Sequence, residues 1–328
     1  MPTPTPSSPI KASVIIPVKN GGALFKHVLK SVLEQETPWP FEVLVIDSGS
    51  KDGSPEYAES LGVRVHHIAP SSFGHGRTRN LGASLSHGEF IVFLTHDAMP
   101  ADRSWLHNLV SACELTPRTA GAFGRHLAYP DASPITRREL ATHFAGFGQE
   151  PVTVFLEDRQ RYDREEGYRQ FLHFFSNNNA CLRRSVWETI PFPDVDFAED
   201  QAWAKKIIEA GYEKAYAPDA CVYHSHDFGI IETLQRAFDE SRALKRIFGY
   251  VLAPSLLSGL RSWAYLVRRD LAWLREDVPA GRQRLVLMLR SPFLAGARIA
   301  GQYLGGREDR FPAWMTRIIS RDKTIQAK

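Results

Sequence analysis

Cysteine is scarce in this 328-residue sequence, and what there is lies far apart, with no CxxC pair: Cys113, Cys181 and Cys221. This argues against a disulfide framework and against a structural zinc site, so we expect a reducing compartment. No apolar run reaches the roughly 20 residues that a membrane-spanning helix needs. The net charge of +3 is too small to indicate a nucleic-acid partner.

The charge is unevenly distributed along the chain. From Ile230 to the last residue there are 18 Lys and Arg against 9 Asp and Glu, so the preceding residues carry a net charge of −6. This asymmetry indicates that the two parts face different partners. Residues 1–11 are rich in Pro, Ser and Thr without an apolar segment, and we expect a disordered arm there rather than a signal peptide.

Strand-like and helix-like segments alternate over the first hundred residues. β-Branched apolar runs predict buried strands at 13–18, 41–46 and 90–94, while apolar residues at helical spacing predict a helix over 22–35. A short helix and a short strand are expected between residues 54 and 69. Such alternation is typical of an α/β fold with a mostly parallel sheet covered by helices on both faces. Residues 116–169 show no clear element.

Ligands of such sheets bind at the carboxyl ends of the strands, where polar residues gather in this sequence. Asp97 ends the run "FIVFLTHD" and is placed to hold Mg²⁺ or Mn²⁺, which take oxygen ligands; a helix-capping or turn carboxylate is the alternative. Asp47 and Asp52 flank the loop "DSGSKDGS", which suits contacts to a base or ribose or simply an ordinary turn.

Three further patterns carry chemistry. Arg79 lies with Arg77 between glycines in "GHGRTRNLG", which favours a phosphate contact over a solvated loop before a helix. Glu199 and Asp200 are the first residues of a predicted helix. One of them could act as a general base, or both could simply interact favourably with the helix dipole. Two histidines share one face of a predicted strand in "YHSHDF", and they line a cleft or simply pack there: His224 and His226.

The order of these motifs along the chain resembles the inverting GT-A-fold glycosyltransferases of family 2. The matching pieces, between Ala12 and about Phe228, are "SVIIPVKN", "VLVIDSGSKDGS", "GRTRNLGA", "FIVFLTHDAMP", "FAEDQAW" and "CVYHSH". A narrower likeness, to rhamnosyltransferases, rests on "SSFGHGRTRNLGA", "LTHDAMP" and "FFSNNNACLRRSVWETIPF". The resemblance implies transfer of a sugar, with dTDP-L-rhamnose expected as donor and a saccharide or lipid-linked glycan as acceptor. It places the protein in polysaccharide biosynthesis for the cell envelope.

The resemblance also assigns roles to residues. It makes Asp200 the base with Glu199 beside it, and it places Asp97 with His224 or His226 at the metal and diphosphate site. Thr95 replaces the first acid of the family's DxD motif, which puts strict metal dependence in question. The residues implied at the donor are Pro17, Lys19, Asp47, Asp52, Arg79 and Asp97. Three consecutive amides, suited to sugar hydroxyls, are expected at the acceptor: Asn177, Asn178 and Asn179.

The implied organisation has three parts. The arm of residues 1–11 precedes a GT-A catalytic domain over 12–229, with a nucleotide-binding half to about residue 100 and an acceptor-binding half from about 101. A basic helical extension follows over 230–328. It mixes apolar patches with Trp263, Tyr265 and arginines, a pattern that suits contact with an anionic membrane interface. The alternative is a helical extension packed on the catalytic domain or on a second copy of the chain in a homo-oligomer.

Rival functions are distinguishable by their products. A glycosyltransferase with another donor, such as a UDP-sugar, shares every feature above. A sugar-nucleotide nucleotidyltransferase also uses parallel sheets and acidic metal sites, but releases pyrophosphate instead of a nucleoside diphosphate. A non-catalytic nucleotide-sugar-binding protein would not need Asp200. We expect the enzyme in the cytoplasm, with the inner face of the cell membrane as its further site of action.

Overall fold

The structure, a computed structural model, describes residues 9–195 and 197–320. Residues 1–8 of the expected arm lie outside this range. The chain forms two compact units, one from residues up to Leu127 together with His143–His224, the other from Ala128–Thr142 together with the residues from Ser225 onward. The predicted domain boundary at residue 229 stays a prediction.

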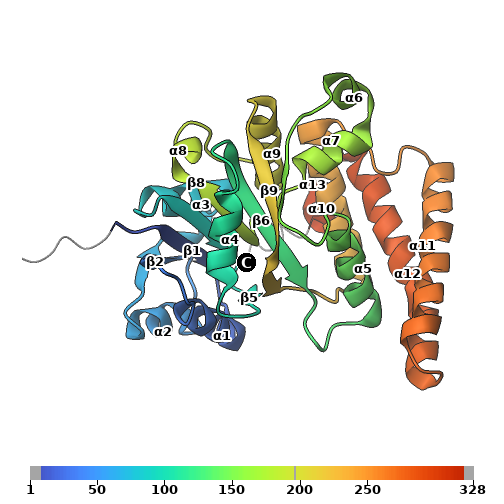
Figure 1. Cartoon of the computed structure of the whole chain (residues 1–328). Coiled ribbons are helices and arrows are strands. Elements are labelled where there is room, and N and C mark those ends of the chain that lie inside the picture. Colours follow the sequence, from blue (N-terminus) through green and yellow to red (C-terminus); the bar gives the residue numbers. More distant parts are fainter. Residues whose placement is uncertain (1–8, 196, 321–328) are drawn as a thin grey trace, which may run out of the picture. The chain divides into compact units, whose positions relative to one another are not determined.

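The first unit is built on a nine-stranded sheet with the order β3-β2-β1-β4-β8-β6-β9-β5, with β7 paired to β9 (Figure 1). Its strands are β1 Ala12–Val18, β2 Phe41–Asp47, β3 Arg64–His67, β4 Phe90–Leu94, β5 Met99–Pro100, β6 Thr119–Leu127, β7 Val152–Val154, β8 Asn179–Arg183 and β9 Glu213–Tyr223. The four strands β1 to β4 are parallel to one another, whereas β8 runs antiparallel to both β4 and β6.

Helices of the first unit connect these strands. They are α1 Gly22–Leu33, α2 Ser54–Ser60, α3 His75–Ser84, α4 Trp105–Cys113, α6 Arg159–Arg164, α7 Glu166–His173, α8 Arg184–Trp187 and α9 Glu199–Glu209, with a 3₁₀ turn over Pro70–Ser72. Helix α5, Pro134–Ala145, runs from the second unit into the first. The α/β class predicted from the alternation is confirmed.

Helices cover both faces of β1, which explains its continuous apolar run. Val14 and Ile16 belong to a core that also holds Phe25 of α1 and Trp105 of α4, all fully buried. Ile15 points to the other face and meets α3 at Gly82, where an added Cβ would lie 2.5 Å from the isoleucine side chain. The strand therefore has no polar face, and its ends are the positions left for polar chemistry.

Sequence patterns were least informative between residues 116 and 169, where the structure places β6, β7 and most of α5 to α7. Six consecutive residues of β6, 119–124, are buried, so this strand shows no alternation of polar and apolar residues. The expected loop at "GRTRN" is also helical, because α3 begins at His75. Arg77 and Arg79 therefore project from a helix rather than a flexible loop.

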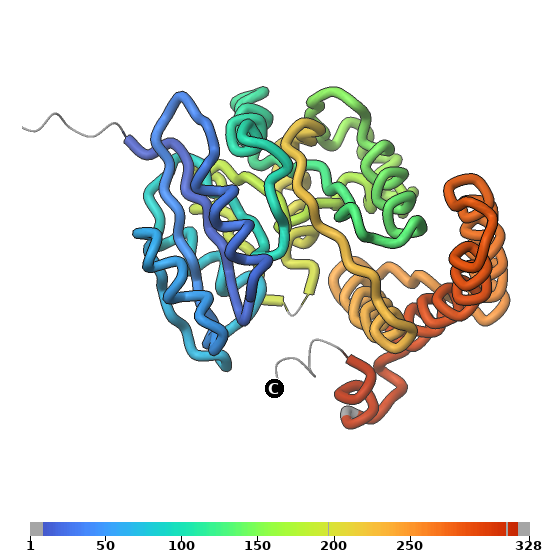
Figure 2. Tube along the Cα trace, turned by 90° about the horizontal axis from the view of Figure 1, so that it is seen from below, coloured from blue at the N-terminus to red at the C-terminus, as the bar shows by residue number. Residues whose placement is uncertain are grey.

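The second unit is helical. It contains α10 Ile230–Phe248, α11 Leu256–Asp277, α12 Arg282–Gly305 and α13 Ala313–Ile319, with a 3₁₀ turn over Glu308–Arg310. Figure 2 follows α10, α11 and α12 as the light-orange to red part of the tube. Helix α12 packs closely on α10, since an added Cβ at Gly301 would lie 2.3 Å from the Leu234 carbonyl oxygen. Within residues 9–195 and 197–320, no helix has the length and apolar character required to cross a membrane.

Candidate active site

The carboxyl ends of β1, β2 and β4 lie at one edge of the sheet, because these neighbouring strands are parallel. In register, Pro17 pairs with Ile46 and Val18 with Asp47. Strands in a sheet are spaced by roughly 4.8 Å, so the ends of β2 and β4, on either side of β1, are roughly 10 Å apart. Residues after these strands therefore belong to one region of the surface.

Asp47 is held rigidly at the end of β2. Its carboxylate accepts hydrogen bonds from the Gly49 and Ser50 backbone amides, both at 3.1 Å, and His67 Nδ1 lies 3.2 Å from it. Burial by itself would raise the pKa of Asp47, but the hydrogen bonds from Ser50, His67 and Gly49 outweigh it and lower the pKa below its ordinary value. The group is therefore an anion with a fixed orientation.

Asp52 joins the loops that follow β1 and β2. It is exposed and accepts a hydrogen bond from the Gly22 amide at 2.7 Å, at the start of α1. Asn20 strengthens the same junction, because its side-chain oxygen accepts from the Lys51 amide at 2.8 Å. Lys19 and Pro17 are half-buried beside it. Four of the six donor-side residues expected from the sequence thus lie at these two joined strand ends, and Asp52 has a structural task in addition to any ligand contact.

Asp97 lies in the turn after β4 and faces the end of β9. Its Oδ1 is 3.6 Å from Nε2 of His224, and the two side chains are 20% and 15% exposed. A carboxylate oxygen and an imidazole nitrogen at this separation form a donor pair of the kind that divalent cations bind. His226 follows two residues later, in the second unit.

A buried histidine packs against His224, the imidazole member of this pair. The rings of His126, on β6, and His224 meet edge to face with centroids 5.3 Å apart. Burial, and next the neighbouring His224, lower the pKa of His126 well below its ordinary value, so it stays neutral. The backbone amide of His224 donates to the Leu127 carbonyl at 2.8 Å. Both contacts fix where the His224 ring lies.

The second acidic group is formed by Glu199 and Asp200 at the start of α9. Ala198, which precedes them, has φ 58° and ψ 36°, in the left-handed region that residues other than glycine rarely adopt. Such strain costs on the order of 1–3 kcal/mol, and it is found where the surrounding structure needs a particular chain direction. Here the kink sets the direction in which both carboxylates leave the helix.

Glu199 is buried and fully engaged. Its Oε1 accepts from Arg79 Nη1 at 2.9 Å and from the Asn177 side-chain amide at 3.1 Å. Burial would raise the pKa of Glu199, but the Arg79 charge, followed by His75 and the Asn177 hydrogen bond, lowers it overall. Glu199 is therefore a permanent anion, and its charge acts on its neighbour.

Asp200 has the opposite character. Its two carboxylate oxygens accept from the backbone amides of Asn177 at 3.1 Å and Gln201 at 2.8 Å, and the residue keeps partial exposure. Burial of the carboxyl, and next the negative charge of Glu199, raise the pKa of Asp200 from 3.8 to about 7 despite these hydrogen bonds. A carboxylate with this pKa is suited to accept a proton near neutral pH.

The asparagine segment connects the two acidic groups. The Asn178 carbonyl accepts from the Thr95 amide at 3.4 Å, and Leu94 of β4 pairs with Asn179 of β8. Asn177, which precedes Asn178, donates hydrogen bonds to Glu199 through its side chain and to Asp200 through its backbone amide. A short series of contacts therefore joins the turn that carries Asp97 to the start of α9.

The three asparagines differ in exposure. Asn179 is fully buried: its Oδ1 accepts from Trp105 Nε1 and its Nδ2 donates to the Ala220 carbonyl, both at 2.8 Å. Asn177 is also buried, with its amide on Glu199, and only Asn178 is partly exposed. Direct acceptor contact by all three stays a prediction, and the geometry favours Asn178 for it.

Arg79, expected beside the donor, is 5% exposed and paired with Glu199. On the next residue of the helix, Asn80 donates to the Phe192 carbonyl and accepts from Trp187 Nε1, both at 2.9 Å. Helix α3 thus supports the segment that leads into α9. Two of the three motifs behind the rhamnosyltransferase likeness, those around residues 79 and 187, are in direct contact. Contact of Arg79 with a donor stays a prediction.

Sequence reasoning missed three contributors to the site. His67 is within hydrogen-bonding distance of the Asp47 carboxylate, and the ring of His126 packs against that of His224. The side-chain amide of Asn177 donates a hydrogen bond to Glu199. The first two had only a weak signal, a histidine within a short strand-like segment. For the third, no local pattern distinguishes one asparagine of the triplet from the others.

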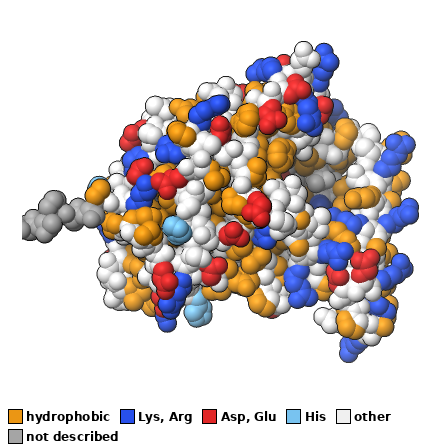
Figure 3. All heavy atoms as spheres, viewed as in Figure 1, with side chains coloured by type: hydrophobic (Ala, Val, Ile, Leu, Met, Phe, Trp, Pro, Cys, Tyr) orange, Lys and Arg blue, Asp and Glu red, His pale blue; other side chains and the backbone are white. Residues whose placement is uncertain are grey.

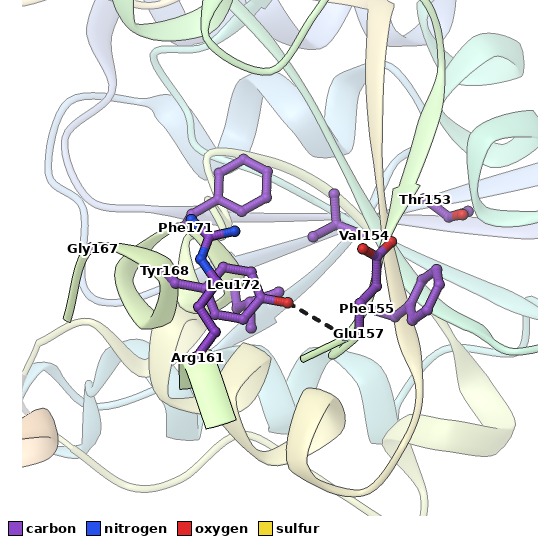
Figure 4. Close-up of a pocket in the computed structure, with 9 residues that line it drawn as sticks. All are labelled: Thr153, Val154, Phe155, Glu157, Arg161, Gly167, Tyr168, Phe171 and Leu172. Carbon is purple, nitrogen blue, oxygen red and sulfur yellow. Dashed lines mark hydrogen bonds between the residues drawn. The ribbon is translucent and has the colours of Figure 1, made fainter. Parts of the chain in front are cut away.

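A separate cavity of about 380 Å³ lies between β7 and α7 (Figure 4). Phe155, Tyr168 and Phe171 provide its aromatic surface, and Glu157 and Arg161 stand at its rim. The Tyr168 hydroxyl accepts from the Glu157 amide at 3.3 Å. None of the nine lining residues is among those expected at the active site, so this cavity is distinct from the residues at the strand ends.

Comparison with known proteins identifies the family. Residues 13–191 match the family Glycosyl transferase family 2. The chain is 38% identical over 326 residues to the O-antigen chain rhamnosyltransferase RfbN of Salmonella typhimurium (strain LT2), covering 96% of both chains. It is 33% identical over 230 residues to the O-antigen chain rhamnosyltransferase WbaN of Salmonella anatum, covering 69% of this chain and 70% of the relative.

Solved structures confirm the GT-A fold. The mannosyltransferase PcManGT from Pyrobaculum calidifontis, determined in complex with GDP-Man and Mn²⁺, superposes with a TM-score of 0.58 at 20% identity, over 94% of this chain and 92% of that one. The likeness to rhamnosyltransferases expected from the motifs is confirmed by RfbN and WbaN. With the strand-end acids and the acid pair of α9 in place, the chain belongs to glycosyl transferase family 2 and is a glycosyltransferase.

Proposed function

We propose that the protein transfers L-rhamnose from dTDP-L-rhamnose to a hydroxyl group of a saccharide or a lipid-linked glycan, with inversion at the anomeric carbon. The observation that carries the donor sugar is the 38% identity to an O-antigen chain rhamnosyltransferase along nearly the whole of both chains. The chemistry is supported by the carboxyl of Asp200, whose pKa near 7 fits the task of a base.

In this proposal Asp200 takes the proton of the acceptor hydroxyl. The oxygen then forms its bond to the anomeric carbon while the bond from that carbon to the diphosphate oxygen breaks, and dTDP leaves with the electron pair. A single displacement of this kind inverts the anomeric centre and needs no covalent enzyme intermediate. The amides of Asn177 and Gln201 hold the carboxylate in place throughout.

The donor side is assigned to the strand ends. The fixed anion Asp47 suits hydrogen bonds to the hydroxyl or N–H groups of a nucleoside, with Pro17, Lys19 and Asp52 next to it. Asp97 and His224 are proposed to hold a divalent cation, with His226 as a further candidate. Such a cation, when bound, offsets the negative charge that develops on the departing diphosphate. Arg79 supports the acid pair through Glu199 and is a positioning residue in this proposal.

Acceptor contact is proposed for Asn178, since it is the partly exposed member of the triplet. We place the enzyme in the cytoplasm, in contact with the inner face of the cell membrane. The support for a reducing compartment is chemical: the three cysteines are free, and Cys113 and Cys181 are buried.

The test is a comparison of donors with the purified full-length protein. Release of nucleoside diphosphate is measured by mass spectrometry from dTDP-L-rhamnose, UDP-glucose, UDP-N-acetylglucosamine and GDP-mannose, with Asp200→Asn as the inactive control. We expect turnover of dTDP-L-rhamnose well above the other three. Preference for one of the others would remove rhamnose from the proposal and leave glycosyl transfer standing, whereas release of pyrophosphate would contradict glycosyl transfer itself.

A further inference from the structure

Helices α11 and α12 form an antiparallel pair with an apolar groove between them. The groove measures about 430 Å³ and is lined mainly by hydrophobic side chains, among them Leu256, Leu260, Trp263 and Ile299. Trp263 Nε1 donates to the Pro292 carbonyl at 3.0 Å, which ties one helix to the other. The hydrogen bond between the two helices therefore holds the walls of the groove in place.

An unusual apolar stripe continues along the first half of α12. Leu285, Leu289 and Phe293 are four residues apart, so they share one face of the helix, and they are 59%, 64% and 66% exposed. Leu256, Leu257 and Leu260 on α11 are exposed to a similar degree, at 57% to 72%. Large apolar side chains gathered in this way mark a binding surface.

Arginines accompany this apolar surface. Arg261, Arg268 and Arg275 recur at seven-residue intervals and therefore share one exposed face of α11. In the described part of the chain none of the three forms an ion pair, whereas Arg269 and Arg298 both pair with Glu139. Figure 3 shows basic side chains next to hydrophobic ones in the part of the molecule where Figure 1 draws α11, whose basic residues are all arginines.

We infer that the α11–α12 pair is a docking surface for a membrane leaflet that carries anionic lipid. This inference rests on the proposed membrane contact of the enzyme and names the surface that makes it. Apolar side chains enter the interface between headgroups and acyl chains, while the arginines meet the lipid phosphates. Neither helix is apolar enough to span the membrane, so the pair lies on it.

A second copy of the chain is a poorer occupant. Residues 256–305 hold eight arginines against three acidic residues. A two-fold symmetric interface would place this surface against itself and bring like charges together. An anionic surface neutralises the same arginines, and charge complementarity therefore favours lipid.

Flotation of the full-length protein with vesicles tests the inference, without donor or acceptor. The vesicles consist of phosphatidylcholine alone or of phosphatidylcholine with phosphatidylglycerol. We expect binding to the anionic vesicles at 0.05 M salt, little binding to the neutral ones, and release at 1 M salt, where the Debye length falls to about 3 Å.

Two variants and two matched controls identify the surface. Arg261→Gln/Arg268→Gln/Arg275→Gln should lower partitioning on the order of 100-fold, since each basic residue near an anionic surface contributes roughly a factor of five. Its control removes as many exposed charges from the first unit, as Arg159→Gln/Arg164→Gln/Lys206→Gln. Leu285→Ser/Leu289→Ser/Phe293→Ser should also abolish binding, and its control is Leu61→Ser/Leu115→Ser, at exposed leucines of the first unit.

Several outcomes overturn the inference. These are absence of binding to anionic vesicles at low salt, equal binding to neutral vesicles, or equal losses in the controls. A parent protein that is dimeric by light scattering, and monomeric in the Leu285/Leu289/Phe293 variant, assigns the surface to self-association instead. Nucleoside diphosphate release, measured without vesicles, reports separately on the proposed function and shows that each variant is folded.

Discussion

Arg79 Nη1 donates to Glu199 Oε1 at 2.9 Å across 120 residues of sequence, and the two side chains are 6% exposed. This buried ion pair joins helix α3 to the start of α9, next to the proposed base. Removing one partner of such a pair leaves an unpaired buried charge. The pair therefore links the stability of the unit to the geometry of its acidic group.

Replacement of the arginine tests this link. Arg79→Met should lower the free energy of unfolding by about 3–5 kcal/mol, because it leaves the Glu199 carboxylate buried without its cation. Urea denaturation measures the effect. Arg77→Met is the matched control two residues away, since Arg77 is exposed and its pair with Asp194 should contribute less than about 1 kcal/mol. Equal losses in the free energy of unfolding would show that the buried pair stabilises the protein no more than the exposed one.

Loss of the base should affect turnover more than binding. Asp200→Asn keeps one of the two oxygens that accept from the Asn177 and Gln201 amides but removes the proton acceptor, so kcat should fall by roughly 10²-fold or more. The affinity for donor, measured by calorimetry, should stay within about twofold. If turnover survives in this variant and is lost in Glu199→Gln, the base is Glu199.

The pH dependence of kcat/KM should reflect the environment of Asp200. Because its pKa is about 7, activity should rise with pH and level off above that value. Glu199→Gln removes a neighbouring negative charge, which favours the ionised form of Asp200 and lowers its pKa. The acidic limb of the profile should therefore move to lower pH. A limb that stays in place, or moves to higher pH, contradicts the electrostatic role of Glu199.

The same raised pKa has a cost in stability. The folded protein holds the Asp200 proton more tightly than the unfolded chain, so this contribution is present below pH 3.8 and is lost as pH rises to about 7. Asp200→Asn should gain in Tm relative to the parent from pH 4 to pH 7, with a constant difference above. Asp219→Asn, at an exposed carboxylate, should show no such trend in the same calorimetric scans.

Divalent metal should strengthen donor binding through Asp97. In the parent protein, Mn²⁺ should lower the Kd for the nucleotide sugar, and a chelator should reverse the effect. Asp97→Asn and His224→Ala should each reduce the metal effect by about tenfold or more, as loss of groups around a metal does. His226→Ala, measured alongside by calorimetry, decides which histidine takes part. If the Kd for the donor in the parent protein is the same with and without Mn²⁺, the proposed cation has no role in donor binding.

The sequence by itself was sufficient for the parts of this protein that depend on local pattern. Three elements follow from apolar periodicity and from residues that break it: the buried strand that ends at Asp47, the buried strand that precedes Asp97, and the helix that begins with Glu199. The GT-A fold and the family followed from the order of these motifs, and both are confirmed.

Only the tertiary structure decided which side chains meet. It paired Arg79 with Glu199 and placed the Asn177 side chain within hydrogen-bonding distance of the same glutamate. It also packed the ring of His126 against that of His224, and it gave Asp200 its raised pKa. It also decided the elements of residues 116–169, where a strand buried on both faces has no alternating pattern. The physical reason is that hydrogen bonds and burial depend on distance in space. Partners that come from different helices, strands and loops leave no mark on the local spacing from which a sequence is interpreted.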